Sequence, residues 1–72
     1  MYDFIIQRIE RGHDVTVDAS HFDISQLMML ARAAFTHDVT LRLANGPFRV
    51  EDALAVRRAG RGHVERAGPR AA

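Results

Sequence analysis

Three histidines stand at equivalent places in an eight-residue phrase that the chain repeats. Each copy has an aliphatic residue, an arginine two places later, an apolar residue, a small or turn residue and then histidine. The copies occupy residues 6–13, 30–37 and 56–63. Stacked copies would bring His13, His37 and His63 into a column with the roughly 5 Å spacing of neighbouring strands. Three imidazoles in a row can bind zinc, nickel or copper.

A second interpretation makes the same histidines helix caps. Each one falls where a helix is expected to end, and a histidine there can bond the last carbonyl groups and suits the negative end of the helix dipole. No carboxylate joins the three at the matched spacing of a built metal site. The sequence therefore favours capping, and we assign no metal-ligating residue.

A column of arginines accompanies the histidines. Arg8, Arg32 and Arg58 share one place in the repeat, and three more arginines could extend them into a basic ridge that contacts phosphate. These are Arg57, Arg61 and Arg66. No aromatic residue interleaves with them, and no helix-turn-helix or zinc-finger spacing appears. The alternative is a solvated helix face, so a nucleic-acid-associated regulator using the Arg-rich C-terminal half is our second functional hypothesis.

Polar residues follow two of the expected strands, where open α/β sheets place ligands. Ser20, His21 and Asp23 follow the first, and Asn45 and Gly46 follow the second. The first three are too close in sequence to form a nucleophile–base–orienter relay without a sharp turn. A phosphate-binding loop needs several glycines and a lysine, which the second loop lacks. We expect no enzyme activity and no cofactor.

Size limits what the fold can do. The chain has 72 residues and no cysteine. We expect one domain over residues 1–66 and a flexible tail over residues 67–72. A core this small is marginal, and self-association is the support that remains without disulfides. No apolar stretch approaches about 18 residues and no secretory signal is visible, so we expect a cytoplasmic protein.

Charge is spread unevenly along the chain. The net charge is +1, and every basic residue is arginine. Residues 1–36 hold three arginines against five acidic residues, whereas residues 37–72 hold seven against four. Such asymmetry indicates either an anionic partner for the C-terminal half or head-to-tail attraction between copies.

Periodicity and end signals predict three helices, over residues 3–11, 24–35 and 50–59. Asp3 should cap the first helix, and Gly12 should end it in the left-handed conformation. Asp23 and Gln26 fit a capping box for the second, with Phe22 as its hydrophobic staple. Gly60 or Gly62 should end the third.

Alternating apolar and polar residues predict strands over residues 15–19, 39–43 and 63–66. The order αβαβαβ implies a parallel sheet, and the alternation implies that helices cover one face alone. The expected fold is a two-layer α/β repeat with a three-stranded parallel sheet. Alignment at Val15, Val39 and Val64 would set Thr16, Thr40 and Glu65 in one row, with Asp18 beside Arg42 in the next.

The two edges of this sheet differ. Glu65, Arg66 and Pro69 discourage further strand pairing at the edge of the last strand, whereas no comparable residues protect the edge of the first strand. We therefore expect a non-catalytic protein–protein interaction or assembly module that forms homodimers through the first-strand edge or the apolar stripe of the first helix. The residues expected to take part in interaction are Phe4, Ile5, Val15, Val17, Asp18, Arg42, Arg57 and Arg58.

The repeat resembles that of small bacterial β/α-repeat proteins related to leucine-rich repeats. The segments that carry the likeness are VTVDAS (15–20), QLMMLARAA (26–34) and AGRGHV (59–64). The asparagine ladder of true leucine-rich repeats is missing. The resemblance implies a stacking unit used for binding or assembly.

A more distant likeness is to STAS domains, the anti-sigma-factor-antagonist fold. There too a strand ending in aspartate precedes a loop and a helix, and Asp23-Ile24-Ser25 falls near that family's phosphorylated serine. The Asp-Ser-Ser-Gly run of the family and its N-terminal strands are absent from this sequence.

Overall fold

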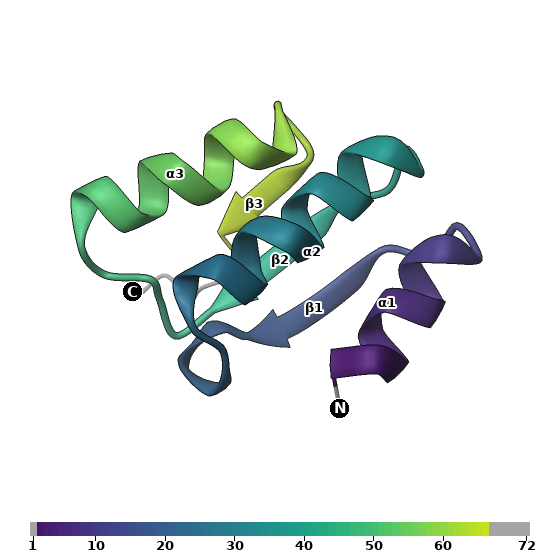
Figure 1. The fold of residues 1–72 in the computed structure, drawn as a ribbon, viewed down its shortest axis with the longest axis horizontal. Helices are drawn as coiled ribbons and strands as arrows, with labels where there is room; N and C mark the ends of the chain where they lie inside the picture. The colour runs from purple at the N-terminus through teal and green to yellow at the C-terminus, as the bar shows by residue number, and fades with distance from the viewer. Residues whose placement is uncertain (1, 67–72) are drawn as a thin grey trace.

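The computed structural model describes residues 2–66, in which three helices alternate with three strands (Figure 1). The predicted tail over residues 67–72, with Pro69, lies outside the described residues. The elements are α1 (Tyr2–Glu10), β1 (Val15–Asp18), the short 3-10 helix η1 (Ala19–His21), α2 (Ile24–Thr36), β2 (Leu41–Ala44), α3 (Val50–Gly60) and β3 (Val64–Arg66).

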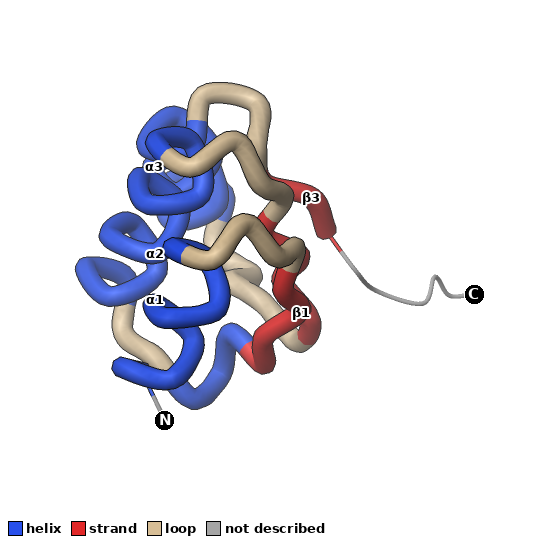
Figure 2. Tube along the Cα trace, turned by 90° about the vertical axis from the view of Figure 1, so that its right-hand side faces the viewer, coloured by secondary structure: helices blue, strands red, loops and turns tan. Residues whose placement is uncertain are grey.

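The strands form one parallel sheet in the order β1-β2-β3. Helices and strands make two separate layers, with all three helices on the same side of the sheet (Figure 2). The predicted two-layer fold is confirmed. None of the helices in the described part has both the length and the apolar character needed to cross a membrane.

The register of the sheet differs from the prediction by two residues in β2. Val15 lies level with Leu41, not Val39, and Leu41 lies level with Val64. Val39 is not in the strand because its N–H donates to Ala34 O at 3.0 Å and closes the end of α2. Strand pairing therefore begins two residues later than the apolar alternation suggests.

The shifted register changes which polar side chains are neighbours. The sequence predicted a row of Thr16, Thr40 and Glu65. In the structure the middle position of this row is Arg42. Arg42 does not lie beside Asp18, whose partner in β2 is Ala44. Arg42 Nε instead lies 3.1 Å from Glu65 Oε1 on β3.

One hydrophobic core joins the helices to the sheet. Its largest fully buried side chains are Ile9, Leu27, Leu30, Leu41 and Val56. Small residues on α2 and α3 let these two helices approach closely. A Cβ on Gly60 would lie 2.3 Å from Val64 Cγ2 and 3.3 Å from Ala31 Cβ, so the glycine makes room for both neighbours.

The predicted helix ends are confirmed where the signal is local. Asp23 and Gln26 form the capping box of α2, and Gly12 ends α1 with φ of 87°. Asp3 is not an N-cap because α1 already includes Tyr2, which places Asp3 in the first turn. Helix α3 ends at Gly60, and the residue that caps it is Arg61, in the left-handed conformation with φ of 48°.

Candidate functional site

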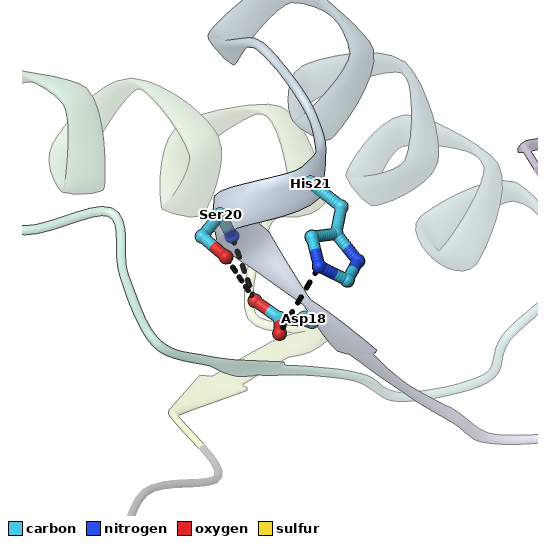
Figure 3. Close-up of polar contacts among 3 residues, drawn as sticks. All are labelled: Asp18, Ser20 and His21. Atoms are coloured by element: carbon cyan, nitrogen blue, oxygen red, sulfur yellow. Dashed lines mark hydrogen bonds and ion pairs between the residues drawn. The ribbon is translucent and has the colours of Figure 1, made fainter.

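At the carboxyl end of β1, Asp18 contacts two polar residues of the following turn, Ser20 and His21 (Figure 3). Asp18 Oδ1 accepts hydrogen bonds from the Ser20 N–H at 3.0 Å and from the Ser20 hydroxyl. Asp18 Oδ2 lies 3.6 Å from His21 Nε2. The Ser20 hydroxyl, followed by its N–H, lowers the pKa of the Asp18 carboxyl. The strand thus ends at Asp18 because this residue caps η1, and the predicted strand residue Ala19 begins that turn.

The order of these contacts decides what chemistry they allow. An activated serine donates its proton to an imidazole, which a carboxylate orients from behind. Here the Ser20 hydroxyl donates to the Asp18 carboxylate, and His21 contacts the same carboxylate. The carboxylate lies between the other two groups, so the cluster stabilises a turn, and the Ser20 hydroxyl is bonded to the carboxylate and not to the imidazole.

Asp23, the third predicted member of that set, serves α2 instead. Its Oδ1 accepts from the Gln26 N–H at 2.9 Å and from the Ser25 hydroxyl at 2.8 Å. The Gln26 Oε1 accepts a hydrogen bond from the Asp23 N–H at 3.0 Å. Among residues 2–66 no hydrogen bond links Asp23 to Ser20 or His21, and the relay is not assembled.

The three histidines each bond the preceding helix through the backbone N–H, and the predicted column is not formed because the register that pairs Val15 with Leu41 sets His13 level with Val39 and not with His37. Each histidine N–H donates to a carbonyl oxygen in or beside the last turn of the helix that precedes it. The bonds run from His13 to Arg8 O (3.1 Å), from His37 to Ala33 O (2.9 Å) and from His63 to Gly60 O (2.9 Å). No group of three or more histidine or acidic side chains within residues 2–66 is placed to hold a metal ion.

The His63 imidazole has a structural setting of its own. Its Nδ1 lies 3.0 Å from Val39 O, and its ring meets Phe35 edge-on at 5.6 Å between centroids. Arg61 lies over the same Phe35 ring at 5.2 Å. Because Nδ1 faces a carbonyl oxygen, it carries the proton in the neutral ring. The imidazole therefore joins the start of β3 to the end of α2.

Residues of the predicted arginine ridge lie at both ends of the sheet. Arg8 lies on α1, where its guanidinium is 6.0 Å from the centre of the Phe4 ring. Arg57 and Arg66 belong to α3 and β3 at the opposite end. All the arginines of the described part are exposed, but these three do not lie on one surface.

Three of the residues expected to mediate interaction are core residues. Ile5, Val15 and Val17 are each less than 8% exposed, because α1 lies against the helix-facing side of β1. Phe4, on the outward side of the same helix, is 60% exposed. These side chains contribute mainly to the core, although all three also line a surface groove beside β1.

The backbone edges of the sheet present a different kind of surface. The Val15 N–H donates to the O atom of Thr40, the residue just before β2, and backbone groups of successive strand residues point to opposite sides. The Thr16 and Asp18 backbone groups therefore face away from β2. By the same reasoning Val64 and Arg66 face away from β2 in β3. We call these the outer edges of the sheet, which no other strand of residues 2–66 pairs with.

A groove lies on the helix-covered side of the β3 outer edge. It has a volume of about 620 Å³ and runs between α3, β3 and the loop before α3. Its lining includes Leu43, Phe48, Val50, Leu54, Arg57 and Arg66, and we call it the α3/β3 groove. Phe48, Val50 and Leu54 are 81%, 71% and 46% exposed. The sequence reasoning missed these three, although the Val50–Leu54 spacing marks a second apolar stripe beside the buried Val56.

A smaller groove adjoins the outer edge of β1. Its volume is about 460 Å³, and we call it the α1/β1 groove. Its lining includes Phe4, Arg8, Asp14, Asp18, His21 and Phe22. Both ends of the sheet thus combine a row of outward-facing backbone groups with apolar side chains.

Searches of protein-family models, curated proteins and solved structures find no match to this chain.

Proposed function

We propose that this chain is a non-catalytic interaction module built from β/α repeats, and that it associates with further copies of itself. One observation carries the proposal: each outer edge of the three-stranded sheet adjoins a groove that exposes apolar side chains. Strand edges of this kind are templates for pairing with another chain.

The energetics favour covering these surfaces. Burying a large apolar side chain completely contributes about 1.5–3 kcal/mol, and Phe48 and Val50 are mostly in water in the isolated molecule. Repeat units are stabilised by their neighbours, and about three are needed before a stack is stable. A further layer on either end would supply both the missing strand partner and the missing apolar contacts.

Light scattering coupled to size exclusion tests the proposal directly. The mass of the wild-type protein should rise with concentration from low to high micromolar. A monomer throughout that range would contradict the proposed self-association.

A heparin column distinguishes the proposal from phosphate binding. An interface built on apolar contacts should depend weakly on salt, whereas phosphate binding weakens steeply as salt is added. Salt-sensitive retention that is lost on replacing Arg57 and Arg58 with alanine would instead support a nucleic-acid-associated regulator.

A further inference from the structure

We infer, on the basis of the proposed self-association, that copies of this chain join head to tail. In this arrangement the α3/β3 groove of one copy receives the α1/β1 end of the next, and the parallel sheet continues from β3 into the neighbour's β1. The occupant of the groove is therefore a second copy of the same chain. Strand direction, apolar surface and charge each support this pairing.

The strand edges fit in one direction. All three strands run parallel, so adding β1 of a second copy to β3 preserves the existing pattern. Continuing the register of the sheet sets the second copy's Val15 level with Val64. A two-fold pairing of β3 with itself would instead be antiparallel and would centre on Glu65, with two glutamates directly opposite. Like charges in that position are destabilising.

The helices continue the same order. In the structure α1 lies outside β1 at one end of the layer, and α3 lies at the other end (Figure 1). Adding a copy in the same orientation brings its α1 alongside α3. The exposed Phe4 of that copy then faces the apolar stripe of Val50 and Leu54. Each side supplies large apolar side chains that water now surrounds.

Charges favour the same pairing on the strand side. The α3/β3 groove is lined by two arginines and one glutamate, Glu65, which already lies against Arg42. The α1/β1 groove is lined by two aspartates and one arginine. In the continued register Arg66 lies level with the second copy's Val17, one position before its Asp18. The helix side holds one arginine from each end, Arg8 and Arg57, so apolar contact must dominate there.

Two substitutions that introduce a charge test the two ends of the molecule separately. Leu54→Arg alters the α3/β3 groove, and Phe4→Arg alters the α1/β1 end, both at positions already exposed to water. Every junction needs one end of each kind. Each variant alone should therefore associate at least about tenfold more weakly than the wild type and stay monomeric at concentrations where the wild type associates. Circular dichroism should show an unchanged fold. If either variant unfolds, Leu54→Ser and Phe4→Ser replace them.

An equimolar mixture of the two variants gives the decisive result. Phe4→Arg keeps an intact α3/β3 groove, and Leu54→Arg keeps an intact α1/β1 end. The mixture should form a one-to-one heterodimer that grows no further, measured by light scattering. Met29→Arg makes a similar change at a 56% exposed position of α2 outside both grooves, and it should associate like the wild type.

The possible failures are distinguishable. If the wild type associates but only one variant loses association, copies meet through like ends. If the wild type associates but the mixture stays monomeric, the two intact ends do not bind each other. The head-to-tail inference is then wrong while the proposed function stands. If the wild type is monomeric at high micromolar concentration, both are wrong.

Discussion

Asp23 shows how a single carboxylate fixes the start of a helix. Its Oδ1 accepts from the Gln26 N–H and the Ser25 hydroxyl, and these bonds favour the charged form. The Gln26 N–H, followed by the Ser25 hydroxyl, therefore lowers the pKa of Asp23. The residue occupies this role because aspartate is among the strongest N-caps, and glutamine three places later completes the box.

Acid should weaken the fold partly through Asp23. Because its folded pKa lies below the unfolded value of about 4, its contribution is present above that pH and is lost as pH falls through the folded pKa. Asp23→Asn keeps an N-cap that does not titrate. Urea unfolding between pH 3 and pH 6 should show a smaller acid-induced loss of stability in this variant than in the wild type. Identical pH profiles would contradict the role given to the ionised carboxylate.

At the scale of elements, the junction of α2, α3 and β3 depends on one glycine. Gly60 is the last residue of α3, and within a helix alanine has the better intrinsic propensity by about 1 kcal/mol. The space that a Cβ would need is taken by Val64 Cγ2 at 2.3 Å and Ala31 Cβ at 3.3 Å. Packing and propensity thus make opposite demands on this position.

Gly60→Ala should destabilise the protein by about 1–3 kcal/mol, because the added methyl group overfills the junction. Urea denaturation followed by circular dichroism measures the change. Gly12→Ala is a useful comparison, since its Cβ meets nothing within 4 Å and its cost comes from φ of 87° alone. A Gly60→Ala protein more stable than the wild type would show that propensity outweighs the close approach.

The same elements show what the sequence could and could not predict. The capping box of α2 depends on residues three apart, and local chemistry is sufficient to find it. The start of β2 depends on Asp14, whose carboxylate accepts from the Thr40 N–H at 2.9 Å across 26 positions of sequence. The alternation of apolar and polar residues within one strand contains no information about a hydrogen bond between residues so far apart in the sequence. Leu54 was missed for a related reason: periodicity marks an apolar stripe but does not say whether another element covers it.

At the scale of the whole molecule, association and folding should be coupled. Anything that binds the native state alone stabilises it, and a second copy acts as such a ligand. The two ends of the sheet thus make measured stability depend on how much protein is present.

The Tm of the wild-type protein should therefore rise by several degrees over a hundredfold range of concentration. About 1 kcal/mol shifts the Tm of a domain this size by roughly 4–8 °C. Leu54→Arg, with its altered α3/β3 groove, should melt at the same temperature throughout. Differential scanning calorimetry is the measurement, and a wild-type Tm independent of concentration would contradict the coupling.

The placement of every helix on one side of the sheet fixes how such an assembly would bend. Neighbouring strands need about 4.8 Å per layer, whereas packed helices need about 8–10 Å. Successive layers must fan outward on the helical side, and a growing stack closes into an arc. The strand face, with Thr16, Arg42 and Glu65 in a row, would line the concave inner wall of that arc.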